Sequence, residues 1–268
     1  MKYKIGDVSK ILGISADLLR YYEKKGVVAP EKNESNDYRY YDSWDINFLI
    51  DCLWFKNFGF SIEQIADIVR IKSTKELDEL FCSKEDELRA TINRCTLLLE
   101  RGEQHRRNLM EMERLLYKCE IAESPHIVRF INRVGNDYPT NTGCDSLARR
   151  WLSAMPFNHR YFELPGAGSL QNEEDCFWGL CLEMDYVKRL NFEISPPMVE
   201  KLPTRCIHTV FKSNGGRGGF APSLLQYALR FAAENSYVIS GNIHGTLLAS
   251  IEEGGKLIGY FEAWLPIE

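Results

Sequence analysis

The sequence has no apolar run that approaches the ~18 residues of a membrane-spanning helix. Its first residues also lack the apolar core of a secretory signal peptide, so we expect a cytoplasmic protein that makes no membrane contact. The eight cysteines form no Cys-x-x-Cys pair and no Cys/His knuckle, which are the spacings of structural zinc sites. We interpret them as reduced, small apolar side chains, and we expect no metal and no cofactor.

A general excess of positive charge, the usual mark of a nucleic-acid-binding protein, is nearly absent as well. The chain of 268 residues holds 33 Lys or Arg against 38 Asp or Glu. Residues 1–74 hold eleven of each kind. Any contact with DNA phosphates must therefore come from a few locally placed side chains and not from a broad positive field.

Two short strings nevertheless point to DNA. Leu18-Leu19-Arg20-Tyr21-Tyr22-Glu23 and Asp37-Tyr38-Arg39-Tyr40-Tyr41 each set an arginine beside tyrosines. This combination suits phosphate oxygens and base edges better than a protein core. A single string of this kind is more often an ordinary amphipathic surface, so the surrounding pattern has to decide.

That pattern predicts a helix-turn-helix unit. Apolar residues recur at helical spacing over residues 5–12, and Gly13 can end this helix in a left-handed conformation. Ser15 is a suitable N-cap for a second helix, which Gly26 closes. The second helix of such a unit lies in the major groove of DNA.

On this second helix we expect two faces. Leu18 and Tyr22 share the face toward the first helix, which leaves Arg20, Tyr21 and Lys24 toward the groove.

The residues after the second helix predict a wing and two further helices. Residues 27–41 are rich in turn-forming residues and predict a small hairpin wing that bears Arg39. A third helix is expected from Ser43 to about Gly59. A fourth opens with Ser61 and Gln64 as a capping box.

The segments from Ile5 to Pro30 and from Asp37 to Val69 together resemble the winged-helix head of the MerR family of bacterial transcription regulators. The resemblance implies a homodimer on a pseudo-palindromic promoter, with Arg20, Tyr21 and Arg39 at DNA-contacting positions. One departure is Asp37, where many members have glycine. The candidate DNA-binding residues are Ser15, Arg20, Tyr21, Lys24, Tyr38, Arg39 and Tyr40.

Residues 75–120 contain no proline and one glycine, and their apolar residues recur at roughly heptad spacing. A long helix with such a seam should pair with a second copy of itself. The resemblance adds that the coiled coil is antiparallel, which the sequence alone does not fix. The seam consists of Leu88, Ile92, Cys95 and Leu99, and after an interruption it resumes at Leu109 and Leu116.

The last part of the chain predicts the order βαββ twice, after a linker near residues 119–126. This order, with the closing segment 260–267, resembles the GyrI-like effector domain fused to multidrug-sensing MerR relatives. The expected elements are strand 127–134, helix 145–155, strands 160–164 and 176–183, strand 205–211, helix 222–235, and strands 243–249 and 257–266.

Alternation in the closing strand places Tyr260, Glu262 and Trp264 on one face of the sheet. A carboxylate held between aromatic rings is poorly hydrated, which raises its pKa unless a positive partner arrives. A greasy organic cation would be such a partner. The alternative is that Glu262 lies at a solvated edge.

The resemblance supports the first interpretation, because Glu262 falls where the family's multidrug sensors place a ligand-facing glutamate. A second acid found in some relatives is replaced by His244 or Gly245. Trp178 and Tyr161 could complete an aromatic cage, although each alone is more often a core residue. The candidate ligand-binding residues are Glu262, Tyr260, Trp264, Trp178, Tyr161 and His244.

We therefore predict an α+β protein with a winged helix-turn-helix domain (1–74), a dimerisation helix (75–120) and a duplicated ligand-binding domain (121–268). It would not be an enzyme. Its partners would be double-stranded promoter DNA, a hydrophobic and cationic small molecule, a second copy of the chain and, through a distorted promoter, RNA polymerase.

Two alternatives stay open. One is a metal or thiol-stress sensor, because Cys82 and Cys119 fall near the positions of the metal ligands in the metal-sensing branch of the family. The other is a GyrI-like hydrolase of small electrophiles, in which Glu262 acts as a general base beside Tyr260.

Overall fold

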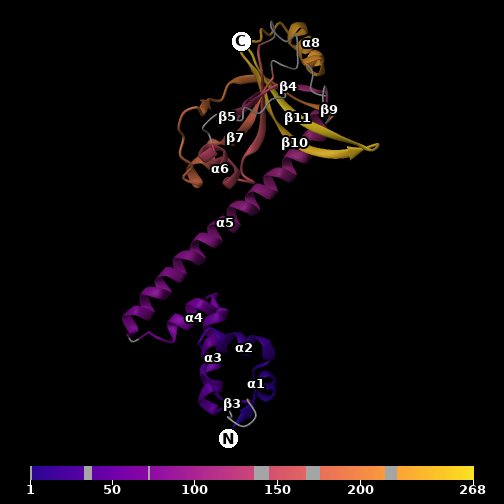
Figure 1. Cartoon of the computed structure of the whole chain (residues 1–268). Coiled ribbons are helices and arrows are strands. Elements are labelled where there is room, and N and C mark those ends of the chain that lie inside the picture. The colour runs from indigo at the N-terminus through magenta and orange to yellow at the C-terminus, as the bar shows by residue number, and fades with distance from the viewer. Residues whose placement is uncertain (1, 33–37, 72, 136–144, 167–175, 215–221) are drawn as a thin grey trace. The chain divides into compact units, whose positions relative to one another are not determined.

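The computed structural model describes residues 2–32, 38–71, 73–135, 145–166, 176–214 and 222–268 (Figure 1). The chain forms two compact units, an N-terminal unit of residues 1–94 and a C-terminal unit of residues 95–268. Helix α5 (Thr74–Leu115) gives its first half to the former and its second half to the latter. Within the described ranges, no helix combines the length and the apolar character that crossing a bilayer requires.

The N-terminal unit has the predicted order of helix, turn, helix and hairpin, followed by two further helices. The predicted α+β class is confirmed, with this helical head followed by α5 and an antiparallel sheet. The elements before α5 are β1 (Tyr3–Lys4), α1 (Ile5–Leu12), α2 (Ala16–Lys24), β2 (Glu31–Lys32), β3 (Arg39–Tyr41), α3 (Ser43–Asn57) and α4 (Ile62–Ile68).

The predicted helix caps are confirmed. Gly13 ends α1 with a φ of +66°, in the left-handed region that favours glycine. Ser15 Oγ accepts the N–H of Leu18 at 3.1 Å and so begins α2. Ser61 and Gln64 form a reciprocal capping box at the start of α4, with distances of 3.1 and 2.8 Å.

The wing is a hairpin of β2 and β3, with β1 on its other side in the order β1-β3-β2. Arg39 pairs with Lys32 in it, while Asp37 lies outside the described residues. In the core beneath, Leu19 and Tyr22 are fully buried. Leu18 was predicted to share the inner face with Tyr22. Leu18 is only partly buried, because the i, i+3 pair formed by Leu19 and Tyr22 points more directly inward.

The C-terminal unit contains the two predicted βαββ repeats, β5-α6-β6-β7 and β9-α8-β10-β11. Three further elements, β4, α7 and β8, were not predicted from the sequence. The elements are β4 (Cys119–Glu123), β5 (Ile127–Val134), α6 (Asp145–Ser153), β6 (His159–Leu164), β7 (Phe177–Glu183), α7 (Met184–Arg189), β8 (Val199–Lys201), β9 (Arg205–Asn214), the 3-10 helix η2 (Pro222–Leu225), α8 (Gln226–Glu234), β10 (Ile243–Glu253) and β11 (Lys256–Pro266).

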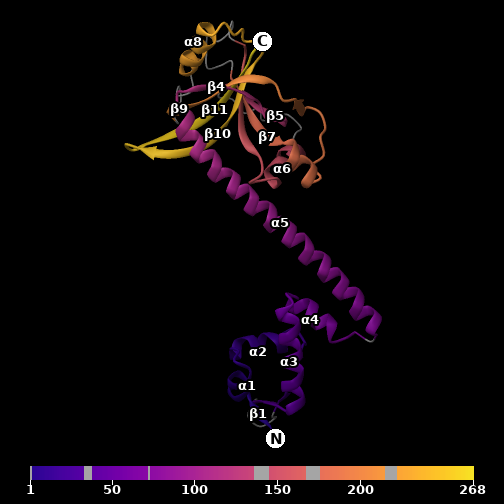
Figure 2. The same cartoon turned by 180° about the vertical axis from the view of Figure 1, so that it is seen from behind.

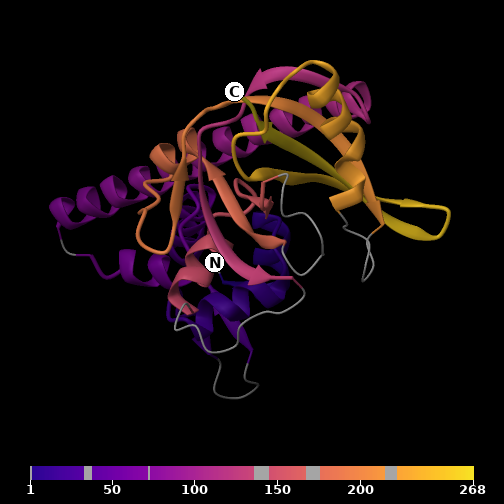
Figure 3. The ribbon, with the colours of Figure 1, turned by 90° about the horizontal axis from the view of Figure 1, so that it is seen from above.

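All eight strands form one antiparallel sheet in the order β4-β9-β11-β10-β6-β7-β5-β8. The order β9-β11-β10 in one half mirrors β6-β7-β5 in the other, and the halves meet where β10 pairs with β6. The hairpin of β10 and β11, yellow in Figure 3, turns at Gly254 and Gly255, which both have positive φ. This arrangement supports the predicted duplication.

The two faces of the sheet have different neighbours. Phe162, Phe211 and Phe261 pack on the face covered by α8, in the largest core of this unit. On the opposite face Met112 and Leu115 of α5 pack against strand residues. Figure 2 shows this end of α5 beside β10 and β11. A cavity remains on this second face, between α5 and the strands.

Candidate functional site

The outer face of α2 presents the predicted DNA-facing side chains. Arg20, Tyr21 and Lys24 are exposed, and Tyr38 at the wing is exposed too. Ser15 is the N-cap of α2, so its hydroxyl is used within the helix. Tyr38, Arg39 and Tyr40 occupy the wing beside α2, with Arg39 and Tyr40 partly buried.

Carboxylates accompany the cations of this face. Asp17 Oδ1 lies 2.5 Å from Arg20 Nη1, and both side chains are exposed. Glu63 pairs with Lys25 at 2.7 Å and accepts the hydroxyl of Tyr21 at 3.3 Å. Its hydrogen bond with Lys25 lowers the pKa of Glu63 to about 2. Ion pairs close to the exposed α2 face therefore offset part of its positive charge.

Arg39 is held by a carboxylate of α2. Its Nε lies 2.5 Å from Glu23 Oε2, and the hydroxyl of Tyr41 donates to Glu23 Oε1 at 2.7 Å. Burial, followed by this hydrogen bond, raises the pKa of Tyr41. Arg39, Arg20 and Lys24 line one hollow of about 410 Å³ between α2 and the wing. Glu23 thus fixes the geometry between helix and wing.

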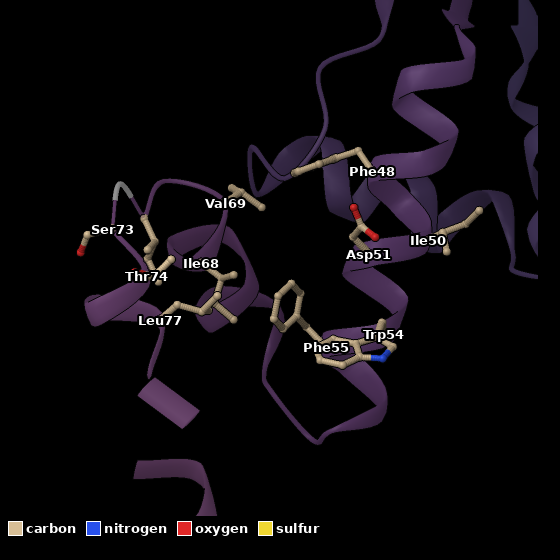
Figure 4. Close-up of a pocket in the computed structure, with 11 residues that line it drawn as sticks. Phe48, Ile50, Asp51, Trp54, Phe55, Ile68, Val69, Ser73, Thr74 and Leu77 are labelled. Atoms are coloured by element: carbon tan, nitrogen blue, oxygen red, sulfur yellow. The ribbon is translucent and has the colours of Figure 1, made fainter. Parts of the chain in front are cut away.

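A second hollow in the N-terminal unit is apolar (Figure 4). It measures about 690 Å³ and lies between α3, α4 and the start of α5. Phe48, Phe55, Ile68 and Leu77 line it, with the half-exposed Trp54 at its rim. Among the described residues that line it, Asp51 alone is charged, so the hollow is mainly an apolar surface.

The cavity of the C-terminal unit measures about 280 Å³ and has a different character. Four glutamates and two histidines line it, and the described lining contains no lysine or arginine. Gln104, Asn108 and Met112 come from α5, opposite the sheet. The titratable lining groups are Glu111, Glu123, His159, Cys181, Glu183, His208 and Glu262.

Strand register explains the centre of this cavity. Glu262 on β11 lies opposite Thr246 on β10, whose hydroxyl donates to Glu262 Oε1 at 2.6 Å. Trp264 lies opposite His208 on β9, and the two rings stack at 3.8 Å with 1° between their planes. Glu120 on β4 lies opposite His208 in turn. The charged groups are therefore placed by cross-strand neighbours on one face.

Glu262 has a polar partner on the neighbouring strand β9. Its side chain is 18% exposed, and His208 Nε2 lies 3.5 Å from Glu262 Oε2. Burial acts to raise the pKa of Glu262, but pairing with His208 and the hydroxyl of Thr246 together hold it below its usual value. The carboxylate is therefore charged near neutral pH.

A second acid and a second histidine lie nearby. Burial raises the pKa of Glu183, which accepts the amide of Gln104 at 3.1 Å. Burial, followed by the charge of Arg101, lowers the pKa of His159 to about 4. Arg101 Nη2 lies 2.9 Å from His159 Nε2. His159 is thus neutral near pH 7, and the cavity carries more negative than positive charge.

Residues 3–71 match the model of the MerR HTH family regulatory proteins, over the segment that forms this head. Residues 3–71 thus form a MerR-type head. The match agrees with the resemblance found in the sequence and covers the helix-turn-helix, the wing, α3 and α4.

Curated relatives of the MerR head are transcription regulators. HmrR of Sinorhizobium medicae, an HTH-type transcriptional regulator, is 34% identical over 25% of this chain and 46% of its own length. The transcriptional activator mta of Bacillus subtilis is 27% identical over 46% of this chain and 58% of its own length. This chain thus spans about half the length of these relatives.

Among solved structures, EcmrR in its complex with DNA is 18% identical to this chain. The comparison covers 99% of each chain, and the TM-score of 0.37 is below 0.5.

Of the predicted ligand-binding residues, Glu262 and Trp264 line the cavity. Tyr260 shares their face but packs against Met112 and Leu115 of α5. Its hydroxyl donates to Glu253, and Lys212 Nζ lies 4.9 Å from the centre of its ring. The pair of Glu262 and Tyr260 that a hydrolase would need is therefore not formed.

Tyr161 and His244 lie on the same face, beside the cavity. Both are buried, and the hydroxyl of Tyr161 donates to Glu163 Oε2 at 2.8 Å. Glu163 also pairs with Arg129 and accepts a hydrogen bond from the amide of Asn242. The polar groups of this cluster therefore bind one another beside the cavity.

Trp178 lies on the opposite face of the sheet, which corrects its predicted place in an aromatic cage. Its ring packs against Phe162 and Phe261 in the core beneath α8, with the guanidinium of Arg133 over it at 4.8 Å. The reason is alternation: Cys181 and Glu183 face the cavity, so Trp178 must face the other way.

Several cavity residues were missed in the sequence. Glu183 could have been found, because it follows Cys181 at a spacing of two in the same strand. His208 and the α5 residues Gln104 and Asn108 could not, because only the pairing of β9 with β11 and the packing of α5 bring them to Glu262.

The cysteines are dispersed. Cys52, Cys176, Cys181 and Cys206 are buried, and Cys82 is exposed in the N-terminal unit. Burial raises the pKa of the Cys181 thiol well above its usual value, although it lines the cavity. In the part of the chain that the structure describes, no three His, Cys, Asp or Glu residues are grouped so that they could hold a metal ion.

Proposed function

We propose that this chain is a ligand-responsive transcription regulator. Its MerR-type head would bind promoter DNA, and its C-terminal cavity would bind a hydrophobic cation that changes how the head acts on the promoter. RNA polymerase would respond indirectly, through the DNA. The observation that carries the ligand class is Glu262, a charged and largely buried carboxylate in a cavity whose described lining residues include no lysine or arginine.

The DNA-binding part of the proposal is supported by the family match and by the exposed α2 face. Arg20 and Lys24 lie on it, and Arg39 flanks it from the wing. Because carboxylates already pair with Arg20 and Arg39, these arginines are oriented before DNA arrives. Oriented arginines suit specific contacts better than general attraction to phosphate.

The ligand part is supported by the chemistry of the cavity. Trp264 offers an aromatic face, and such faces attract cations. Met112 and Leu248 add apolar surface. A volume of about 280 Å³ lies near the lower end of the ~300–1,000 Å³ typical of small-molecule pockets. An apolar cation of small-drug size satisfies all three features.

A homodimer is part of the proposal. Leu88, Ile92, Cys95 and Leu99 form the predicted seam, and all four are exposed in the single chain. An exposed apolar seam on a long helix is stabilised by a second helix. The predicted continuation at Leu109 and Leu116 is wrong as a seam, because these residues pack against the sheet of their own chain.

This function is tested with the variant Glu262→Gln. Calorimetry measures how tightly the variant and the wild type bind two matched probes. Tetraphenylphosphonium is a lipophilic cation, and triphenylphosphine oxide is a neutral aromatic of similar shape. We expect the variant to lose about tenfold or more in affinity for the cation, or about 1.4 kcal/mol, and little for the neutral probe. Affinity for DNA should not change.

The matched control is Glu252→Gln, which removes an exposed carboxylate from β10 outside the cavity. It should bind both probes as the wild type does. Equal losses for the cation and the neutral probe in Glu262→Gln would mean that the residue only supports the fold.

A further inference from the structure

The cavity already contains a flat side chain that can carry positive charge, the imidazole of His208, which is stacked on Trp264. His208 lies parallel to the ring of Trp264 at 3.8 Å, and its Nε2 faces the carboxylate of Glu262 at 3.5 Å. An aromatic cation bound in this cavity would use the same two partners, a π face and a carboxylate. His208 thus occupies a position that such a ligand would itself favour.

We propose that protonated His208 acts as the built-in cation of the cavity, and that a cationic effector binds by displacing its charge, with release of one proton. This inference rests on the proposed function and deepens it, because it names the competitor that sets the specificity of the site. A flat or delocalised cation can replace an imidazolium, whereas a neutral ligand leaves the ion pair of His208 and Glu262 intact.

The contact between His208 and Glu262 is suited to exchange. A distance of 3.5 Å is that of an ion pair and is longer than an ordinary hydrogen bond. Thr246 keeps its own hydrogen bond to the other oxygen of Glu262, at 2.6 Å. The carboxylate can therefore change its cationic partner and still be held in place.

Charged groups on three neighbouring elements face this pair. Glu120 on β4 lies 3.5 Å from His208 Nδ1, so the ring stands between two carboxylates. Arg114 on α5 binds Glu120 with two hydrogen bonds, at 2.8 and 2.9 Å. His159 on β6 also acts on Glu262, but its pKa of about 4 leaves it neutral above pH 5. Glu183 on β7 lines the same cavity, and burial raises its pKa, so a variant of His208 is needed to decide which group releases the proton.

The same contacts connect the cavity to α5. Arg114 pairs with Glu111, which lines the cavity, and with Glu120, which faces His208. When His208 loses its proton, Glu120 keeps Arg114 as its cationic partner. Loss of the charge on His208 therefore strengthens the ion pair between Glu120 and Arg114 of α5.

The experiment is calorimetric titration of the full chain with tetraphenylphosphonium between pH 5.5 and 8. This probe has no titratable proton, so any proton exchanged comes from the protein. Repeating each titration in buffers of different ionisation enthalpy counts the protons released. We expect release of up to one proton by the wild type, and an affinity that rises by up to about tenfold per pH unit while His208 is protonated.

The variant His208→Gln keeps a hydrogen-bond donor but cannot carry charge. It should release no proton, show a flat pH profile and bind the probe more tightly than the wild type at pH 5.5. His208→Asn serves if the glutamine variant does not fold. The matched control is His126→Gln, which removes a histidine paired with Glu200 at 2.7 Å outside the cavity lining and should retain the wild-type profile.

Each outcome separates the two proposals. Binding that depends on Glu262 but releases no proton, or a pH dependence that survives in His208→Gln, would overturn the role of His208 and leave the cation-binding function standing. Wild-type protein that does not bind the probe, or binds it without Glu262, would overturn both.

Discussion

Two glycines of helix α1 differ in backbone conformation but not in the space around them. Gly6 lies within α1, and Gly13 ends the helix at a φ of +66°. A Cβ at either position would meet no atom within 4 Å, so only the backbone distinguishes them. We expect Gly13→Ala to destabilise the chain by about 1 kcal/mol, because alanine is strained at positive φ.

Gly6→Ala is its matched control and should have the opposite sign. Alanine is favoured over glycine in a helix by up to about 1 kcal/mol, with no steric penalty here. Urea unfolding of the full chain, followed by circular dichroism, measures both changes. Destabilisation by both substitutions would mean that α1 packs more tightly than the free space around Gly6 indicates.

Single residues also show which features of the structure could be predicted from the sequence. The caps at Ser15 and Ser61 were predicted because a cap depends on neighbours within four residues. The side-chain face of Glu262 was predicted for the same reason, since alternation is local. Its partner His208 was not, because the register of β9 against β11 decides that meeting over 54 positions of the chain.

At the scale of elements, α5 changes its role along its length. Its seam from Leu88 to Leu99 is exposed, whereas Met112 and Leu115 are buried against the strands. The heptad pattern predicted one dimer interface along the whole helix, from Leu88 to Leu116. It could not separate the two roles, because packing against a sheet and packing against a second helix require the same apolar stripe.

This difference predicts the effect of a charge in the exposed seam. Ile92→Lys should convert a dimer into a monomer in light scattering at micromolar concentration, because an unpaired lysine would be buried between the helices. Ala90→Lys adds the same charge on another side of α5 and should leave the dimer intact. If Ile92→Lys remains dimeric, the copies associate elsewhere, and the apolar groove lined by Phe48, Trp54 and Leu77 becomes the candidate surface.

At the scale of the whole molecule, carboxylates have different roles in the head and in the C-terminal cavity. Carboxylates beside Arg20 and Arg39 limit general attraction of the head to DNA. The cavity has an excess of carboxylates, with His208 as a mobile counter-charge. Under the proposed function, a chain with net charge of −5 would bind an anionic polymer with one unit and a cation with the other, because each site is organised locally.

If both sites act on one protein equilibrium, their coupling must be reciprocal. We expect tetraphenylphosphonium to change the affinity for an operator fragment, selected from random-sequence DNA, by about 5- to 150-fold, the range of ~1–3 kcal/mol. The operator should change the affinity for the cation by the same factor, measured by calorimetry with and without DNA. Fluorescence anisotropy gives the first quantity. In Glu262→Gln both factors should approach one, while unequal factors in the wild type would show that the probe also binds DNA or a second site.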